Sequence, residues 1–319
     1  MMILNKSVAV LPFVNISSDA DNEYFSDGIT EEIINALTTV QGLKVIARTS
    51  SFAFKGKNMD VRTIGRQLGV STVLEGSVRK VEKRIRITAQ LIRTDDGTHL
   101  WSKNFDRELQ DIFTLQDEIS LLIAEKIREN FGHLEIQRHL VEAPTKNIEA
   151  YNLYLKGRYH QLKWNKKDLL KAVEYYKMSI AEDSSFSFPY FGAGLSLGIL
   201  AGWEFMPYDE GITSADEFLK AGLQKDDKNY LGFFALATVS FWGKWNFNKG
   251  YDYFIKALKH SPSFTDIEEG LAELYTANGE FDKALNHANH ILILSPLSPN
   301  HYYTKANIFY LQNDFENAI

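Results

Sequence analysis

Hydrophobic positions in the first part of the chain follow two patterns. Short continuous apolar runs at residues 7–14 and 43–47 favour strands that are buried on both faces of a sheet. Over residues 27–37 and 61–68 the apolar side chains instead recur every three or four positions, which is the stripe of an amphipathic helix. The first four segments are therefore predicted to be strand, helix, strand and helix.

From residue 72 the apolar period changes to two. Residues 72–92 alternate between apolar and polar side chains on both sides of a polar turn, which predicts a β-hairpin with one buried face. An Asp-Gly pair then favours a tight turn into a strand at residues 99–105, and the apolar spacing over residues 111–131 predicts a long helix. We expect residues 1–132 to form an α/β domain with a mixed sheet, in the order β-α-β-α-β-β-β-α.

A different regularity governs the chain after residue 148. Aromatic, alanine and proline positions recur with a period of 34 residues. Such a period, with small residues where helices cross and aromatic residues beside them, is typical of tetratricopeptide repeats. Residues 149–319 are thus predicted to form an all-α superhelical solenoid of about four and a half units, with the repeating aromatic residues in its core, and residues 133–148 to form a linker. The matched pairs are Pro262 with Pro296, Ala284 with Ala318, Tyr275 with Phe309 and Phe241 with Tyr275.

Some aromatic residues of the repeats fall outside these columns. Residues 202–212 are predicted to be an insertion, because this connection is too long for a regular repeat. Aromatic residues in loops are common contact residues, since Trp and Tyr dominate binding hot spots. The alternative is that they fold over the edge of the solenoid. The candidate partner-binding residues are Trp203, Phe205, Tyr208, Trp242 and Trp245.

A second candidate site follows the second predicted strand. Arg48, Ser50, Lys55 and Lys57 lie in a predicted loop at the carboxyl end of that strand, where α/β sheets bind ligands. Their hydroxyl and cationic groups suit an anion. The segment lacks the glycine pattern of a phosphate loop or a dinucleotide site, so a polar loop with capping side chains is the alternative.

Composition narrows the class of protein. With 319 residues, 45% hydrophobic and 24% charged, the chain is an ordinary globular protein of about two domains. Its net charge of −6 argues against direct contact with nucleic acid. No apolar stretch approaches the roughly 20 residues of a membrane helix, so we expect no membrane insertion and a cytoplasmic location. A periplasmic location is the alternative if the chain is part of a membrane-anchored protein.

The sequence contains few residues that could form a catalytic or metal-binding site. The chain has no cysteine, which excludes thiol catalysis and Cys-ligated zinc. His287 and His290 are three positions apart on a predicted helix, but no third ligand accompanies them. The sequence offers neither a credible nucleophile nor a general acid and base pair. We therefore expect no metal, no cofactor and no enzymatic activity.

The first domain carries motifs of a known family. They include Val-Ala-Val-Leu-Pro-Phe at 8–13, Tyr-Phe-Ser-Asp-Gly-Ile-Thr-Glu at 24–31, Phe-Lys-Gly-Lys at 54–57, Leu-Glu-Gly-Ser-Val at 74–78, His-Leu-Trp at 99–101 and Asp-Ile-Phe-Thr-Leu-Gln-Asp-Glu at 111–118. Over residues 7–131 the chain resembles the TolB-like (FlgO-like) domain. In bacteria that domain is found with tetratricopeptide repeats, in proteins that also carry a nucleotide cyclase domain or a winged-helix DNA-binding domain of the CadC kind. The resemblance implies signalling, transcriptional regulation or envelope assembly, and brings no catalytic residues with it.

The expected function is therefore recognition. The concave surface of the solenoid is predicted to bind a protein or peptide, while the partner's identity and the oligomeric state stay open. The alternative is a ligand-sensing α/β domain that binds an anion through Arg48 and its neighbours and regulates a cyclase or DNA-binding effector. Because the last repeat stops within its second helix and a solenoid needs a capped end, we expect a complete protein to continue, with room for an effector domain beyond either end.

Overall fold

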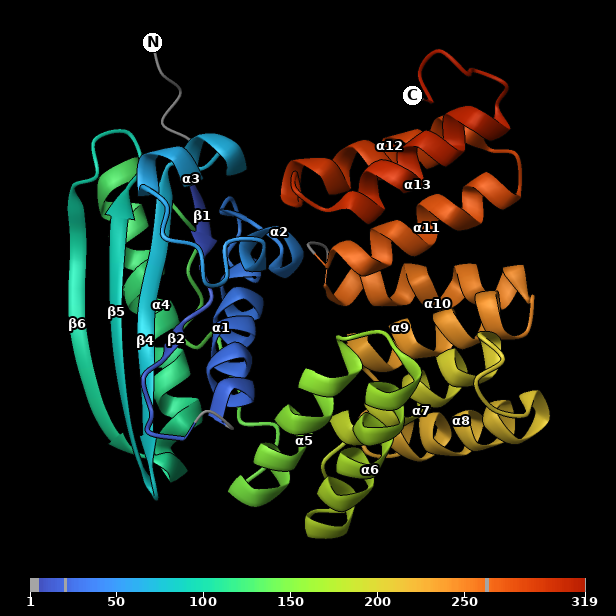
Figure 1. Cartoon of the computed structure of the whole chain (residues 1–319), viewed down its shortest axis with the longest axis horizontal. Helices are drawn as coiled ribbons and strands as arrows, with labels where there is room; N and C mark the ends of the chain where they lie inside the picture. The colour runs from blue at the N-terminus through green and yellow to red at the C-terminus, as the bar shows by residue number, and fades with distance from the viewer. Residues whose placement is uncertain (1–5, 20–21, 262–263, 319) are drawn as a thin grey trace. The chain divides into compact units, whose positions relative to one another are not determined.

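The computed structural model describes residues 6–19, 22–261 and 264–318. These form two compact units (Figure 1). Unit 1 comprises residues 1–143 and 291–301, and unit 2 comprises residues 144–290 and 302–319. The two units are described separately below.

Unit 1 is built on a mixed sheet with the strand order β3-β1-β4-β5-β6, and β2 pairs with β4 beside this path. The apolar run of β1 lies in the middle of the parallel part, between β3 and β4, where all four of its residues are buried. β4, β5 and β6 continue as an antiparallel meander. The strands are β1 Ser7–Val10, β2 Val14–Asn15, β3 Lys44–Val45, β4 Thr72–Val81, β5 Arg84–Arg93 and β6 His99–Glu108.

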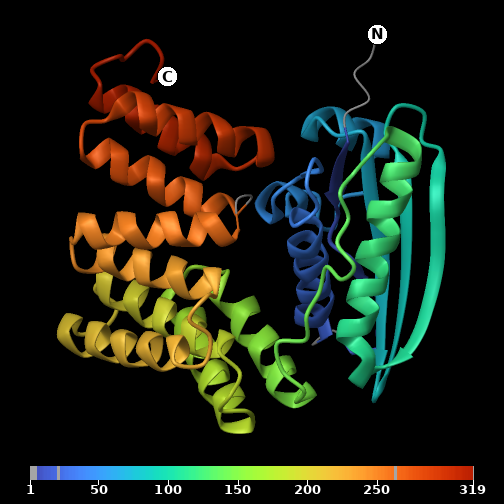
Figure 2. The same ribbon diagram turned by 180° about the vertical axis from the view of Figure 1, so that it is seen from behind.

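Helices cover the sheet according to the predicted apolar stripes. α1 (Glu23–Thr38) and α4 (Ile112–Phe131) pack together on one face, as Figures 1 and 2 show. α3 (Val61–Leu68) packs its apolar side chains against the opposite face at the start of β4. Asp60 caps α3 through its side chain, and Gly69 ends it with a left-handed φ of 62°, which glycine adopts without steric cost. A short 3-10 turn, η2 (Leu109–Asp111), precedes α4.

The predicted elements of unit 1 need three corrections. α1 begins at Glu23 rather than near Asp27, because Asp27 lies inside the helix and its buried carboxylate binds Lys55 instead of capping. The expected strand at 43–47 is only two residues long. The expected loop that begins at Arg48 is a short helix, α2 (Arg48–Phe52). The mixed sheet, the hairpin and the long helix are present as predicted.

Residues 291–301 belong to unit 1, although the repeat pattern groups them with the solenoid. Ala47 donates its backbone N–H to the carbonyl of Leu294 at 2.8 Å. The side chain of Leu297 packs against the apolar cluster under α3. The sequence could not indicate this, since a repeat pattern reports only contacts between neighbouring repeats.

Unit 2 consists of successive helical hairpins, so the predicted helical repeats are present (Figure 1). In each hairpin the first helix is called the inner helix here. The third inner helix ends in a π-helical segment, η3 (Val239–Gly243). The helices are α5 Ile148–Gln161, α6 Lys166–Glu182, α7 Phe188–Gly202, α8 Tyr208–Leu223, α9 Tyr230–Thr238, α10 Phe247–His260, α11 Thr265–Ala277, α12 Phe281–Leu294 and α13 Pro299–Leu311.

Most of the repeating aromatic residues lie in the core of the unit, as predicted: Phe241, Phe254 and Tyr275 are buried, whereas Phe309 is only partly buried. The predicted insertion at 202–212 is wrong. α7 runs to Gly202 and α8 begins at Tyr208, so that only a short turn separates them. The first residues of α8 are mostly polar, so its apolar stripe is not recognisable there in the sequence.

Candidate functional site

One hollow of unit 2 is a groove along the inner helices. It is small and is lined mainly by aromatic and aliphatic side chains. α5, α7 and α9 contribute to it, so that three successive hairpins share one surface. We call it the inner groove. Its lining residues are Tyr154, Arg158, Gln161, Tyr176, Phe188, Phe191, Gly192, Leu195, Leu231, Phe234 and Phe264.

A hydrogen-bond network fixes the polar part of the inner groove. Gln161 donates through Nε2 to the carbonyl of Gly192 at 3.0 Å and to Ser196 Oγ at 2.9 Å. Its Oε1 accepts from the hydroxyl of Tyr176 at 3.1 Å and from Arg158 at 2.9 Å. Since each hydrogen-bonding group of the amide is used, Gln161 holds α5, α6 and α7 together and orients the guanidinium of Arg158.

Two glycines let these helices approach one another. A Cβ atom at Gly192 would lie 2.4 Å from the ring of Tyr176, and one at Gly157 would lie 2.6 Å from it. Any side chain at either position would therefore displace the tyrosine that forms the floor of the groove. The groove depends on small residues at helix crossings, which is the feature that the repeat pattern predicts.

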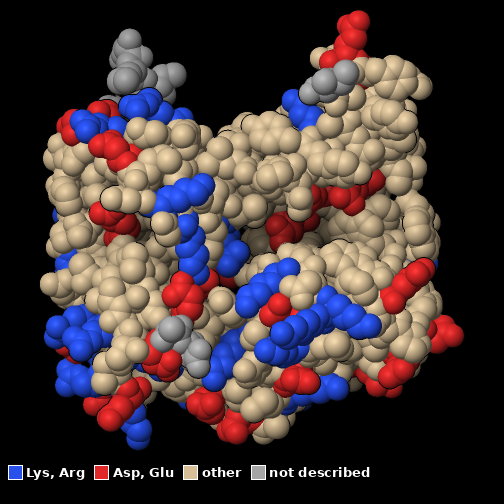
Figure 3. Space-filling view, in the orientation of Figure 1, with Lys and Arg blue, Asp and Glu red and all other residues tan. Residues whose placement is uncertain are grey.

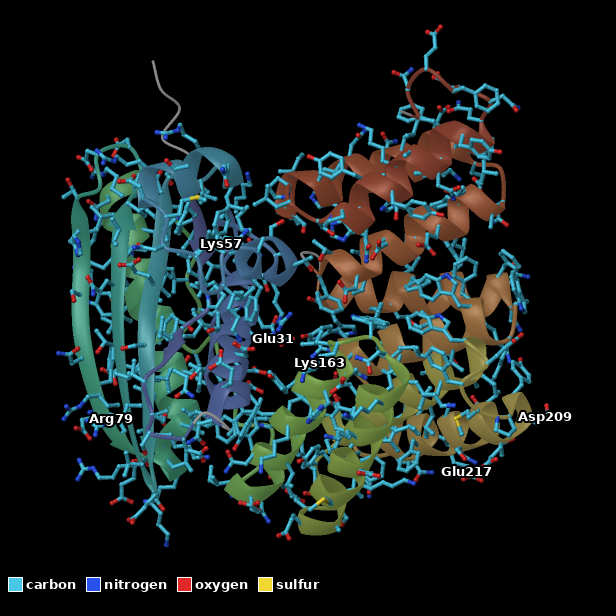
Figure 4. All side chains as sticks on the ribbon, viewed as in Figure 1. Glu31, Lys57, Arg79, Lys163, Asp209 and Glu217 are labelled. Atoms are coloured by element: carbon cyan, nitrogen blue, oxygen red, sulfur yellow. The ribbon has the colours of Figure 1, made fainter. Side chains whose placement is uncertain are left out.

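The predicted partner-binding aromatics lie mostly at the turns within the hairpins. Trp203 and Tyr208 flank the α7–α8 turn and Trp245 follows η3, and the exposed fraction of Trp245 reaches 75%. The hydroxyl of Tyr208 donates to the carbonyl of Gly243 at 2.7 Å, which joins these two turns. Figure 4 shows Asp209 at the start of α8, next to this turn. The prediction that these residues bind a partner is not tested by the geometry.

Two of the five predicted partner-binding residues, Phe205 and Trp242, make contacts away from these turns. Phe205 packs against the core of the hairpins. Trp242 is 37% exposed and donates its indole N–H to Glu273 at 2.8 Å. Sequence reasoning also missed Trp164 in the α5–α6 turn, whose ring lies 6.0 Å from that of Trp203. Its place in the corresponding turn of the preceding hairpin is the signal that would have found it.

Carboxylates gather on α11. Burial raises the pKa of Glu269 to about 7, and the neighbouring Asp266 and Glu273 add to the shift. Burial also raises the pKa of Glu273, although the hydrogen bond from Trp242 opposes the change. Figure 3 shows acidic atoms in a hollow over α11 and basic side chains over α5 and α6 on the same face of the unit.

Glu268 lies on another side of α11 and behaves differently. Burial opposes its charge, but hydrogen bonds from His287 Nδ1 and, at 3.1 Å, from His290 Nδ1 outweigh burial and lower the pKa of its carboxyl group. These two histidines are therefore engaged in packing α12 on α11. Within the described residues, no group of three or more His, Asp or Glu side chains is arranged to hold a metal ion.

The candidate anion site in unit 1 has its own counter-charges. Lys55 binds Asp27 at 2.6 Å and Glu23 at 2.7 Å. Arg48 lies 3.3 Å from Glu31. Lys57 is exposed near the end of α2, and Figure 4 shows it apart from Glu31. An anion here would compete with carboxylates that already face the cations.

Ser50 takes no part in an open site. Its side chain is buried, its hydroxyl accepts from the backbone N–H of Leu297 at 2.9 Å, and it lies 3.1 Å from Ser295 Oγ. Both partners belong to residues 291–301 of the same unit. Anion binding by these four residues remains a prediction that the structure does not test.

The fold and the groove together define a class of protein: an α/β domain joined to helical repeats whose inner helices form a groove. Comparison with known sequences adds two matches. Residues 4–122 match the family model of the HilA/YgeH-like transcriptional regulator, second domain. Over 241 residues the chain is 39% identical to putative adenylate cyclase 3 of Rhizobium meliloti (strain 1021), which covers 74% of this chain. The chain spans 40% of the length of that curated relative.

Similar solved structures are distant. MamA is 16% identical and covers 53% of this chain and 86% of its own, with a TM-score of 0.37. YrrB, described as a TPR protein with an unusual peptide-binding site, is 20% identical and covers 56% and 88%, with a TM-score of 0.35. The LpoB C-terminal domain from Salmonella enterica is 20% identical and covers 33% and 83%, with a TM-score of 0.27. At these scores they carry no argument about function. In the described part of the chain, no helix combines the length and the apolar character that crossing a membrane requires.

Proposed function

We propose that this chain is the interaction part of a bacterial regulatory protein, and that the inner groove binds an extended segment of a partner protein. The observation that supports this most directly is the groove itself, which is lined by aromatic and aliphatic side chains around one oriented arginine. Concave apolar surfaces with a few fixed polar groups are the usual form of a binding site.

The shape of the lining favours a peptide. Phe188, Phe191 and Phe234 come from two successive inner helices and offer apolar contacts along the groove. Arg158, which Gln161 orients, places a guanidinium at one end. An extended segment exposes side chains on both sides and leaves its backbone groups open for such bonds.

The proposal includes the absence of catalysis by this chain. Among the described residues that line the groove, the ionisable ones are an arginine and two tyrosines. A general base would need a carboxylate or an imidazole within hydrogen-bond reach of the substrate. Binding is the chemistry that this lining supports.

The regulatory setting is proposed from the relatives. One match is named for transcriptional regulators and the other is named a putative adenylate cyclase. The resemblance to the TolB-like domain points to the same kinds of protein. We propose that the chain passes a binding signal to an effector of one of these kinds, in the cytoplasm, and that it contacts no nucleic acid itself.

Selection of peptides against the full chain tests the binding proposal. A phage-displayed library is panned on the immobilised protein, and the enriched peptides are titrated against wild type and two variants. Phe188→Ala removes a half-buried ring from the groove, whereas Leu170→Ala trims an exposed side chain of α6. We expect the first variant to lose about tenfold in affinity, equivalent to about 1.4 kcal/mol, and the second to bind as wild type. Peptides that bind both variants equally well would contradict the proposal.

A further inference from the structure

A second hollow of unit 2 is lined mainly by polar side chains. It lies between α8, the π-helical segment η3 and the first turns of α10, and it has a volume of about 170 Å³. Cavities of about 150 Å³ can hold a ligand as large as benzene, so a small molecule fits here. We call this hollow the polar pocket. Its lining residues are Asp216, Leu236, Val239, Ser240, Lys244, Asn246, Lys249 and Tyr253.

A buried serine lines the polar pocket. Ser240, in η3, is only 6% exposed, and within the described residues its hydroxyl group has no hydrogen-bond partner. The hydroxyl of the nearby Thr238, in contrast, donates to the carbonyl of Phe234 at 2.9 Å. Buried hydroxyl groups are nearly always hydrogen-bonded, because leaving one unpaired costs stability. A polar ligand in the pocket would supply the partner of Ser240.

The polar pocket also carries a surplus of positive charge. Lys249 lies in the first turn of α10, is exposed, and forms no ion pair in the described part of the chain. Lys244 donates to a carboxylate oxygen of Asp216 at 2.6 Å, so these two charges satisfy each other. The lining therefore contains two cations and one carboxylate, and the unbalanced charge is that of Lys249.

The next hairpin pairs the corresponding lysine differently. Lys283 stands 34 residues after Lys249, at the same position of the repeat, and forms an ion pair with Glu280. Asn246 occupies the position that matches Glu280. Its side-chain oxygen accepts from the backbone N–H of Lys249 at 3.1 Å and caps α10, and its amide NH₂ group has no partner among the described residues. A neutral donor thus replaces a carboxylate beside the unpaired lysine, which suits an anionic ligand.

The backbone around the polar pocket is unusual in two places. η3 is π-helical, a rare conformation that is frequent at functional sites. Trp245 has a left-handed φ of 54°, whereas the matching residue of the next hairpin is Gly279, with a φ of 75°. A bulky residue in this conformation is strained, and such strain is found most often at functional sites. Trp245 separates Lys244 from Asn246, so the strained residue lies between two residues of the lining.

We propose that the polar pocket binds a small organic phosphate. The phosphate group lies beside Lys249, and the hydroxyl of Ser240 and the amide of Asn246 donate to its oxygen atoms. The N-terminus of α10 adds partial positive charge to the same place. Leu236 and Val239 contact a short hydrocarbon part of the ligand.

The arrangement of the donors favours phosphate over carboxylate. They come from η3, from the turn after it and from α10, so they approach a ligand from different directions and suit the several oxygen atoms of a phosphate. A planar carboxylate is matched best by the fork of an arginine, and the lining contains none among its described residues.

The volume of the polar pocket limits the size of the ligand. Drug-sized ligands occupy pockets of about 300–1,000 Å³, so this smaller pocket suits a phosphate group with a few carbon atoms. The proposal goes beyond the binding of a partner protein and does not depend on it, because the polar pocket and the inner groove share no lining residue.

Calorimetric titration of the full chain tests the proposal with three probes at equal ionic strength: propyl phosphate, inorganic phosphate and butyrate. We expect propyl phosphate to bind with a dissociation constant of about 1 mM. Inorganic phosphate lacks the hydrocarbon part and should bind about threefold more weakly. Butyrate should bind at least about tenfold more weakly than propyl phosphate.

Two variants place the ligand in the polar pocket. Lys249→Gln removes the unpaired cation and should weaken the binding of propyl phosphate about tenfold. Asn246→Glu introduces the carboxylate of the next hairpin beside Lys249 and should abolish binding although every cation is kept. Lys259→Gln removes the same charge from the last turn of α10, is the matched control, and should bind as wild type does. Thermal unfolding of each variant verifies that the fold is intact.

Three results would overturn the proposal. The first is butyrate binding as tightly as propyl phosphate, which would contradict the preference for phosphate. The second is an equal loss of affinity in Lys249→Gln and Lys259→Gln, or full affinity in Asn246→Glu, which would place the anion outside the polar pocket. The third is the absence of binding by any probe up to about 20 mM. Each of these results leaves the peptide-binding proposal for the inner groove intact.

Discussion

The two candidate sites of this molecule use charged side chains in opposite ways. In unit 1, Lys55 lies between Asp27 and Glu23, so that cation and carboxylates satisfy each other within one small cluster. In unit 2, Arg158 and Glu269 lie on different inner helices with uncharged helices between them. Adjacent opposite charges stabilise a fold, whereas the inner groove of unit 2 is lined mainly by uncharged aromatic and aliphatic side chains, which suit a binding surface.

The largest expected loss of stability comes from a side chain added at the floor of the inner groove. Gly192→Val places a side chain where the ring of Tyr176 lies 2.4 Å from the new Cβ atom. We expect a loss of about 3 kcal/mol in the free energy of unfolding of the repeats. Urea unfolding followed by tryptophan fluorescence measures it.

The matched control for this prediction is Gly202→Ala. Nothing lies within 4 Å of the Cβ that it adds, at the end of the same helix, α7. This variant should unfold at nearly the wild-type urea concentration. Equal stability of the two variants would show that Tyr176 does not pack as described.

The charge cluster of unit 1 should prove structural. Lys55→Met leaves the buried carboxylate of Asp27 without its cation, and we expect a loss of about 2 kcal/mol. The loss stays below that of a fully buried pair because the Lys55 side chain is 35% exposed. Far-UV circular dichroism during thermal unfolding measures it, with Lys57→Met as the exposed control. If Lys55→Met is as stable as wild type, the cluster is not structural, and its cations are again candidates for ligand binding.

The buried carboxylate of Glu269 on α11 should cost stability at high pH. Because the folded pKa of Glu269, about 7, lies above its ordinary value of 4.5, ionisation is less favourable in the folded chain and stability falls as pH rises between these values. Glu269→Gln keeps the size and removes the charge. It should gain about 1–2 kcal/mol at pH 8 and nothing at pH 4. A gain that is equal at both pH values would point to a cause other than titration.

The neighbouring Glu268 should show the opposite sign at a smaller magnitude. Its folded pKa is lowered, so its contribution is present above the ordinary value of 4.5 and is lost as pH falls through the folded pKa. Replacing both His287 and His290 by Gln should cost about 1 kcal/mol at pH 6. The cost should vanish in acid, where Glu268 is protonated. Unfolding curves at a series of pH values decide between this result and a constant offset.

Much of the fold was predictable because periodicity reports burial. The 34-residue spacing predicted the helical hairpins and the buried Phe241 and Tyr275, and alternation predicted the β4–β5 hairpin. The predictions that were wrong concern the ends of helices and strands, where tertiary contacts decide the boundary. The apolar stripe placed the start of the first helix at residue 27, yet Asp27 lies inside α1, where its carboxylate binds Lys55, which is remote in sequence.

The candidate site was harder to predict than the fold. Exposed aromatics such as Trp203 were visible as departures from the repeat, but the groove is lined by residues that follow the repeat, such as Phe191 and Gly192. A core position and a groove position share one periodic signature. Only the packing of inner helices tells them apart. Likewise, Ser50 looked like an accessible hydroxyl because its partner Leu297 is remote in sequence.

Hydrogen exchange of the full chain, with and without a peptide enriched by the phage selection, tests the central claim that the inner groove is the binding site. The account predicts slower exchange in α5, α7 and α9, around Arg158, Phe191 and Phe234, with unit 1 unchanged. Protection confined to residues 48–57 of unit 1, or to the exposed turn at Trp203, would contradict it.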